Sequence, residues 1–369
     1  MEFKPHLPFD GLPPLPPLSF NSLIKHPNVL SELVHAEKEL SYLKGLCGFA
    51  PNPMVFLSLP MIRESVASLE IEALQTTVND VIQGQMFPDE QKSPAAEKAI
   101  QYLDAIKWGF NNLRSYQLTH KLICGVQERV LGTKEGYRRT PNAIQTKNIP
   151  PKTIYTPPIA SLIPQKMSNW ERFANTSDPK IVGSSLIRAV LCHYQFEAIH
   201  PFGDGNGRTG RILLVLHLVQ EGLLTHPILN VSEYLNKKRP IYYHSLLGVT
   251  KNRAWQRFTL FMLRAITRQA QSTSELILKL KKEHEYFNER LKSKFPKIFN
   301  SKLPDHIFEN IYTSPSFVER AGIMSRVTAS NHLNKLSKSE LLMVIEKGTY
   351  RFFCIPKVYE LLNTKKADE

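Results

Sequence analysis

The chain has 369 residues, of which 42% are hydrophobic and 22% are charged. These values fit a globular protein with room for two domains and exclude a fibrous or disordered chain, while the lack of a long apolar run or signal-peptide pattern predicts a cytoplasmic protein with no membrane partner. The formal net charge of +14 favours an anionic partner, although charge alone does not choose among a nucleotide, a nucleic acid and an acidic protein.

The N-terminal arm, residues 1–30, is rich in proline. Six prolines fall between residues 4 and 18, including the run Leu-Pro-Pro-Leu-Pro-Pro at 12–17. Such a segment favours an extended polyproline II conformation. It could be a ligand for an SH3-type domain, but we favour a strap that lies across the protein's own surface.

Helices follow this arm. One amphipathic helix is predicted over 29–45 and a second over 60–82, where Pro60 suits the first turn and apolar residues recur every three or four positions. In the second helix Ser68 and Glu72 lie four residues apart and share a face, so the carboxylate could reach a cationic pocket. From the residues alone, a solvated helix face is the commoner explanation of this pair.

The next part of the chain changes from helix to hairpin. Residues 96–130 are predicted to be helical, as one helix or as two joined near 111–116, because the apolar period breaks there. Two short extended segments, 136–144 and 152–158, follow with a polar loop between them. In a helical protein such a hairpin offers backbone groups to which a partner peptide can add as a strand. A purely structural hairpin is the alternative.

The most informative stretch is 200–211, which joins two predicted helices. Pro201 ends the apolar helix at 184–198 and holds His200 at its end, while the apolar run 212–219 marks the next helix. Gly203, Gly205 and Gly207 let the loop turn its N–H groups inward around an anion. The second helix points its positive end at the same place, so the loop is predicted to bind phosphate.

The polar residues of this loop are those that a magnesium-bound phosphate requires. Arg208 and Arg211 share one helix face and can clamp two phosphates of one ligand. Asp204 offers the hard oxygen that magnesium prefers, and His200 is the candidate general base. Each residue alone has an ordinary structural explanation, but their combination at this spacing indicates a phosphate site. No Gly-Lys-Ser/Thr follows the glycines, so the loop is not a P-loop.

The stretch resembles the signature of the Fic family, whose members mostly transfer AMP from ATP to a hydroxyl group of a protein. The residues that match are His200, Pro201, Phe202, Asp204, Gly205, Asn206, Gly207, Arg208 and Arg211. The resemblance implies a mostly α-helical Fic domain over residues 31–290, with ATP as substrate and magnesium as the metal. It also implies a protein target, which can be the chain itself, and it suggests a homodimer.

The resemblance assigns roles around the loop. His200 would take the proton from a Ser, Thr or Tyr hydroxyl, and Asp204 would hold magnesium on the α- and β-phosphates. Tyr242 and Tyr243, at the start of a predicted helix that ends near residue 250, would wall the adenine pocket, although core packing is the commoner role of such tyrosines. The residues expected to bind the rest of ATP are Gly203, Gly205, Asn206, Gly207, Arg208 and Arg211.

The resemblance also gives Ser68 and Glu72 an inhibitory role. Many Fic proteins carry Ser or Thr, three residues, Glu and then Gly or Asn in an inhibitory helix, and the glutamate pairs with the second arginine of the signature, here Arg211. That pairing keeps the γ-phosphate of ATP from its productive position. Ala73 departs from the pattern, because it stands where Gly or Asn is usual. Fic proteins also use a hairpin flap to align the target, a role that falls here to Thr153, Ile154, Tyr155 and Thr156.

A long helix over 255–290 is predicted to lead to a C-terminal domain at 297–369. There, helices over 314–322 and 325–336 precede two extended segments within 344–353, an order that resembles a winged helix-turn-helix domain. The second of these helices could contact DNA, but winged helices also bind proteins. Its exposed polar residues are expected to be Arg326, Thr328, Ser330, Asn331 and Lys335.

Three other functions stay open. A protein with the same signature can remove AMP, with Glu72 positioning a water molecule. It can use another nucleotide or a phosphocholine donor, which the intact signature makes the weaker hypothesis. It can also be a transcriptional regulator in which the Fic domain senses a nucleotide.

Overall fold

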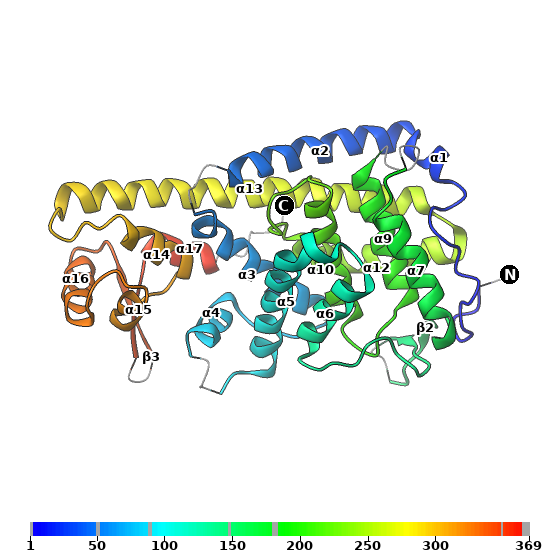
Figure 1. Ribbon diagram of the computed structural model, residues 1–369, viewed down its shortest axis with the longest axis horizontal. Helices are drawn as coiled ribbons and strands as arrows, with labels where there is room; N and C mark the ends of the chain where they lie inside the picture. The colour runs from blue at the N-terminus through cyan, green and yellow to red at the C-terminus, as the bar shows by residue number, and fades with distance from the viewer. Residues whose placement is uncertain are drawn as a thin grey trace.

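The computed structural model describes residues 3–48, 52–87, 91–146, 149–178, 184–347 and 350–363. It is mostly helical, with two small antiparallel hairpins, as predicted (Figure 1). The first half contains α1 (Phe20–Ile24), α2 (Pro27–Cys47), α3 (Met54–Ile71), α4 (Val78–Met86), α5 (Pro94–Tyr116), α6 (His120–Leu131), β1 (Ile144–Gln145), β2 (Thr153–Tyr155), η1 (Ala160–Leu162) and α7 (Ile163–Ala174). The second half contains α9 (Ser185–Ile199), α10 (Asn206–Gln220), α11 (Val231–Lys237), α12 (Arg239–Asn252), α13 (Trp255–Lys294), α14 (Lys302–Asn310), α15 (Pro315–Arg320), α16 (Arg326–Lys338), β3 (Met343–Lys347), β4 (Tyr350–Cys354) and α17 (Pro356–Asn363).

One long helix, α13, runs most of the length of the molecule (Figure 1). Helix α13 has 40 residues, which corresponds to about 60 Å. Helix α2 packs along it, so the two lie side by side, with α15 and α16 near one end and the N-terminal arm near the other (Figure 1). Among the described residues, no helix is both long and apolar enough to cross a membrane.

The core of the molecule surrounds α9 and α10. Both helices are apolar around most of their circumference, and nearly all of their side chains are buried. They pack against each other and against α5, α6 and α7. The loop 200–205 between them is therefore held at both ends by rigid, buried elements, which is what precise placement of its side chains requires.

The bounds predicted for a helix over 60–82 are wrong. Helix α3 begins at Met54, so Pro60 lies inside it rather than in its first turn, and it ends at Ile71. Helix α4 then starts separately, because the Thr77 and Asp80 side chains form a capping box at its N-terminus. The apolar period continues across the break, so the pattern alone did not reveal it. Similarly, α5 and α6 are two helices that are separated at Gln117, where φ is +50°.

The proline-rich arm lies across the protein's own surface, which confirms the favoured interpretation. Leu12 and Leu15 are buried in the core. The backbone of Leu15 exchanges two hydrogen bonds with the Asn169 side chain, at 2.8 and 2.9 Å, and the Gln195 amide donates to the Pro13 carbonyl at 2.8 Å. Side-chain amides of the protein itself thus bind the backbone of the arm, as the side chains of a separate recognition domain would in an SH3-type complex.

The C-terminal unit, α14 to α17 with β3 and β4, has the predicted order of helices and hairpin. It packs on α3 and α4. The Phe87 and Phe352 rings are 5.1 Å apart, the Arg63 guanidinium donates to the Leu361 carbonyl, and the Tyr312 hydroxyl donates to Asn79. Residues 364–369 of the predicted domain lie outside the described part of the chain. Helix α3 is therefore held between the helical core and the C-terminal unit.

Candidate active site

The backbone of the loop after α9 is fixed by its own residues. His200 ends α9 in the left-handed region, with φ of +50°. The Asn206 side chain closes the loop by accepting a hydrogen bond from Phe202 N at 2.9 Å and donating to Phe202 O at 2.8 Å. Gly205 has φ of +74°, and a Cβ there would lie 3.1 Å from the Leu131 side chain. Glycine is required at this position on both counts.

The loop opens onto a cavity of about 660 Å³. This volume suits a nucleotide-sized ligand. No side chain caps the first turn of α10, so its first N–H groups are available to an anion. The loop residues that line the cavity are His200, Gly203, Asp204, Gly205, Asn206, Gly207 and Arg211.

The Glu72 carboxylate forms ion pairs with both arginines of the loop, Arg208 and Arg211. Its two carboxylate oxygens are 3.0 Å from Arg208 Nε and 3.2 Å from Arg211 Nη2. Arg211 also donates to the Ser68 hydroxyl at 3.0 Å and to the Ser68 carbonyl at 2.9 Å. Both guanidinium groups are buried, at 1% and 2% exposure, so few other groups can neutralise them. The pairing of Glu72 with Arg208 was not predicted from the sequence.

Gly207 makes this approach possible. A Cβ on Gly207 would lie 3.0 Å from Arg211 Nη1 and 3.5 Å from Glu72 Oε1. Burial opposes the charge of Arg211 more than any single neighbour favours it, but Glu72 together with Tyr102, Tyr242 and Glu197 outweighs burial and raises the pKa of Arg211 above its ordinary value. The guanidinium therefore stays charged.

Asp204 lines the cavity and is the one carboxylate of the loop 200–211. It is 71% exposed, its Oδ1 accepts a hydrogen bond from Gly205 N at 2.6 Å, and its Oδ2 is 3.6 Å from Arg208. Among the described residues, no group of three or more metal-ligating side chains occurs. A single exposed carboxylate fits magnesium that brings its other ligands from phosphates and water.

His200 is neutral near physiological pH. Desolvation lowers the pKa of its imidazole to about 4. Its Nδ1 is 3.4 Å from the Glu197 carbonyl. A neutral imidazole is the form that can accept a proton, so this environment suits a base.

Arg138 holds the backbone at His200 and was missed by the sequence interpretation. Its Nε donates to the His200 carbonyl at 2.9 Å, its Nη2 to the Pro158 carbonyl at 2.5 Å, and its backbone N–H to the Pro201 carbonyl at 2.8 Å. These bonds tie the loop to the segments on both sides of the hairpin. No spacing in the sequence marks this residue.

Glu197 is a second residue that was missed. It lies one turn before His200, lines the cavity, and its Oε1 is buried without a hydrogen-bond partner. Burial raises its pKa to about 7, with Arg211 opposing this rise and Glu72 adding to it. A carboxylate inside the otherwise apolar helix 185–199 was the available signal.

Tyr242 and Tyr243 both line the cavity, on α12. Tyr242 is 2% exposed, and its hydroxyl is 2.8 Å from His193 Nε2, so most of its side chain packs in the core. Tyr243 is 49% exposed. Of the two, Tyr243 has the surface that could stack on a planar base.

The hairpin residues divide into two kinds. Ile154 is exposed and lines the cavity, and Thr153 is half-buried and does not line it. Tyr155 is buried, and its hydroxyl donates to the Ala198 carbonyl at 2.6 Å. The Thr156 carbonyl accepts a hydrogen bond from Phe9 N at 3.0 Å, and its hydroxyl donates to the Pro5 carbonyl at 2.7 Å. The N-terminal arm therefore already occupies one end of β2.

Three family models match successive parts of the chain. Residues 30–111 match the Fic/DOC family N-terminal model, 117–218 match the Fic/DOC family model, and 284–358 match the C-terminal domain of SoFic-like protein adenylyltransferases. The chain thus contains a Fic/DOC domain. The middle match contains the whole loop 200–211, so the site lies in the part that defines the Fic family.

Relatives and solved structures agree with this assignment. A probable protein adenylyltransferase of Aquifex aeolicus is 30% identical over 205 residues, which are 53% of this chain and 59% of the relative. The protein adenylyltransferase Fic of Drosophila yakuba is 27% identical over 45% of this chain and 30% of its own length. The chain thus spans about three fifths of the first relative and less of the second.

Two solved structures share the fold. A Fic family protein from Desulfovibrio desulfuricans has a TM-score of 0.57 and 17% identity, covering 93% of this chain and 98% of that one. Residues 134–508 of Fic-1 from C. elegans have a TM-score of 0.52 and 18% identity, covering 67% and 73%. The first alignment extends over nearly the whole chain, so the Fic fold is not confined to the signature.

Ala73 occupies a backbone conformation that disfavours alanine. It follows Glu72 at the end of α3, and its φ is +59°. A residue with a Cβ costs about 1–2 kcal/mol in this region, and glycine does not incur that cost. Gly and Asn adopt this conformation at a lower cost than Ala.

We therefore expect Ala73→Gly to raise the free energy of unfolding by about 0.5 kcal/mol, the relief of strain less the added unfolded-state entropy. Ala67→Gly is the matched control, because Ala67 lies inside α3. There the same substitution should destabilise the protein by about 1 kcal/mol or more. Chemical denaturation of the three proteins measures both effects. Equal destabilisation by the two substitutions would contradict the assigned strain.

Proposed function

We propose that this protein is a protein adenylyltransferase that transfers AMP from ATP to a hydroxyl group of a protein, and that Glu72 inhibits it. The observation that carries the proposal is the nucleotide-sized cavity at the loop 200–211, which is lined by a neutral imidazole, an exposed carboxylate and the Arg211 guanidinium, while the buried Arg208 lies next to it and pairs with Glu72. The relatives named protein adenylyltransferases support the same chemistry.

In the proposed reaction the chain positions ATP and removes one proton. The first-turn N–H groups of α10 and the two arginines bind the phosphates, and the hydroxyl of the target attacks the α-phosphorus while pyrophosphate leaves. His200 accepts the hydroxyl proton at the ring nitrogen that faces the target. Arg138 keeps the His200 backbone in place, as a positioning residue. Magnesium, held through Asp204, would neutralise phosphate charge.

The proposed inhibition follows from charge. The two carboxylate oxygens of Glu72 pair with the two guanidinium groups that would otherwise bind the β- and γ-phosphates of ATP. A buried ion pair of this kind is costly to break by removing one partner, so ATP must compete with an attached carboxylate of high local concentration. Withdrawal of Glu72 would free both arginines at once.

The group transferred is tested with two labels. The Glu72→Gly variant is incubated with ATP labelled at the α-phosphate or at the γ-phosphate, with a lysate as a source of targets. We expect protein to acquire the α label only, and chelation of magnesium to stop it. Acquisition of the γ label would indicate kinase chemistry instead. Loss of AMP from protein that was modified beforehand, without labelling, would favour the AMP-removing alternative.

A second candidate function rests on α16. Arg326, Thr328, Asn331 and Lys335 are exposed along this helix, and Ser330 is half-buried. We propose, on this observation, that the C-terminal unit is a winged helix that binds DNA. Titration of the full chain with duplex DNA at rising salt tests it. Non-specific electrostatic binding is lost as the salt concentration rises. If the observed binding is lost in the same way and Asn331→Ala leaves it unchanged, sequence-specific recognition is rejected.

A further inference from the structure

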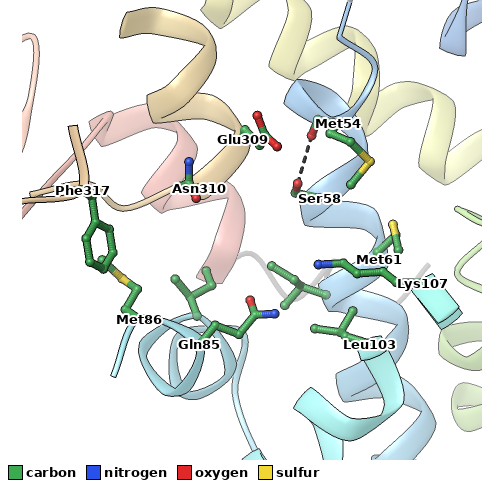
Figure 2. A pocket seen from close by; sticks show the side chains of 12 residues that line it. Met54, Ser58, Met61, Gln85, Met86, Leu103, Lys107, Glu309, Asn310 and Phe317 are labelled. Atoms are coloured by element: carbon green, nitrogen blue, oxygen red, sulfur yellow. Dashed lines mark hydrogen bonds between the residues drawn. The ribbon is translucent and has the colours of Figure 1, made fainter. Parts of the chain in front are cut away.

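A second cavity lies where α3, α4 and α5 meet the C-terminal unit, and it shares no lining residue with the cavity at His200. Its volume is about 270 Å³. Met61 and Leu103 line one side and Met86 and Phe317 another, as Figure 2 shows. We refer to it as the seam cavity.

Lys107 is the cationic residue of the seam cavity. Its ammonium end points into the space between Ser58 and Gln85 (Figure 2). Within the described ranges, neither Lys107 nor Gln85 forms a hydrogen bond or an ion pair through its side chain. The Glu309 carboxylate also lines the cavity, and its Oε2 accepts a hydrogen bond from Asn52 at 3.0 Å. A ligand carboxylate can pair with Lys107, and the Met, Ile, Leu and Phe side chains of the lining can contact a hydrocarbon body.

The volume limits the size of such a ligand. At about 30 Å³ for each water molecule, the cavity corresponds to about nine waters, or a molecule of about ten non-hydrogen atoms. A small aliphatic or aromatic carboxylate has this size and this combination of groups.

The seam cavity touches α3 on both sides of its proline. Ser58 precedes Pro60 and Met61 follows it. Proline cannot donate a hydrogen bond to the carbonyl four residues earlier, so the helix can bend at this point. A ligand that contacts both sides would restrict bending at Pro60. It would thereby restrict the direction of the remaining helix, which reaches Glu72 about 16 Å further on.

We propose that the seam cavity binds a small apolar carboxylate and that this ligand holds α3 in the position that places Glu72 on Arg208 and Arg211. The cavity exists in the conformation that has these ion pairs. A ligand that fits it stabilises that conformation over one with α3 displaced. The binding half of the proposal is independent of the proposed function, and the inhibitory half rests on it.

Binding is tested with octanoate and, as a neutral match of the same size, octanamide. A ligand of this size is expected to bind with a Kd on the order of 1 mM. Octanoate at about 10 mM should then slow hydrogen exchange of residues 66–74 about tenfold, because exchange there requires the displaced conformation. Octanamide should do much less. Lys107→Met should remove the preference for octanoate, and Ser58→Trp, which fills the cavity, should remove the response.

The inhibitory half is tested by AMP labelling. Ser68→Ala removes one hydrogen bond to Arg211 and is expected to label protein at an intermediate rate. Octanoate should lower the rate of this variant several-fold and leave that of Glu72→Gly unchanged, because no glutamate remains to be held. Inhibition of Glu72→Gly to the same extent would show competition at the ATP cavity and would overturn regulation through α3.

Two further outcomes separate the two proposals. The seam cavity is not the binding site if octanoate leaves hydrogen exchange of residues 66–74 unchanged, or if octanoate still slows that exchange in Ser58→Trp. If octanoate slows hydrogen exchange at residues 54–62 alone, the cavity binds the ligand but is not coupled to Glu72. If Glu72→Gly labels nothing while exchange at 66–74 responds as expected, the transferase proposal fails and the ligand site stands.

Discussion

Replacement of Glu72 by glycine is expected to raise the rate of AMP incorporation from ATP by about 100-fold or more. The carboxylate bridges two buried guanidinium groups, and pairs of this kind contribute about 3 kcal/mol when one partner is removed, which corresponds to a factor of about 100. Initial rates with α-labelled ATP measure the effect directly.

Glu70→Gly is the matched control for this prediction. Glu70 lies on the same helix end, but its carboxylate accepts a hydrogen bond from Asn236 at 2.8 Å instead of contacting the loop. Its rate should stay close to that of the wild type. An equal rise in both variants would mean that loosening of α3, rather than loss of the Glu72 charge, activates the protein.

In the Glu72→Gly background, His200→Ala is expected to lower the rate about 1,000-fold, the size of a lost general base. Binding of ATP should be retained, because the phosphates are held by the arginines and by α10. His244→Ala is the control, since His244 is exposed on α12 and does not line the cavity. A loss of ATP binding in His200→Ala equal to its loss of rate would contradict the assignment of His200 as the base.

The pH dependence has a definite sign. Because desolvation lowers the pKa of His200 to about 4, the neutral form that accepts a proton predominates throughout the neutral range. The rate contributed by this group should be flat between about pH 6 and pH 8 and should fall only as the pH approaches about 4. A rate that falls already through pH 6.5 would mean that the imidazole is solvated during catalysis.

The signature loop could be predicted from the sequence because its determinants are local. Pro201, the glycines and the apolar runs on both sides fix where α9 ends and α10 begins, and the structure has these bounds within a residue or a few. The long helix α13 was predicted for the same reason, since its apolar period is uninterrupted over most of its length.

The contact between α3 and the loop could not be derived from periodicity. Ser68 and Glu72 are 0% and 27% exposed, although their spacing is that of many solvated helix faces. Only the resemblance to the Fic family pointed to Arg211, and even that did not predict the contact with Arg208. Such pairings between distant segments depend on how whole helices pack, which a local pattern does not contain.

Two other features depended on tertiary structure in the same way. Arg138 acts through backbone carbonyls that only the folded chain brings together. The break after Ile71 depends on the left-handed Ala73, a residue type that gives no turn signal. By contrast, the position of the proline-rich arm across the protein's own surface could be predicted from composition, because an extended segment with apolar residues tends to bury them against the surface nearest to it.

Intact mass spectrometry can show whether this protein is a transferase that Glu72 restrains. Glu72→Gly is incubated with ATP, magnesium and a lysate, beside the wild type and beside Glu72→Gly with His200→Ala. We expect protein to gain the mass of whole AMP groups with the single variant and not with the other two. Folded Glu72→Gly that binds ATP, yet adds AMP neither to itself nor to any lysate protein, would contradict this expectation.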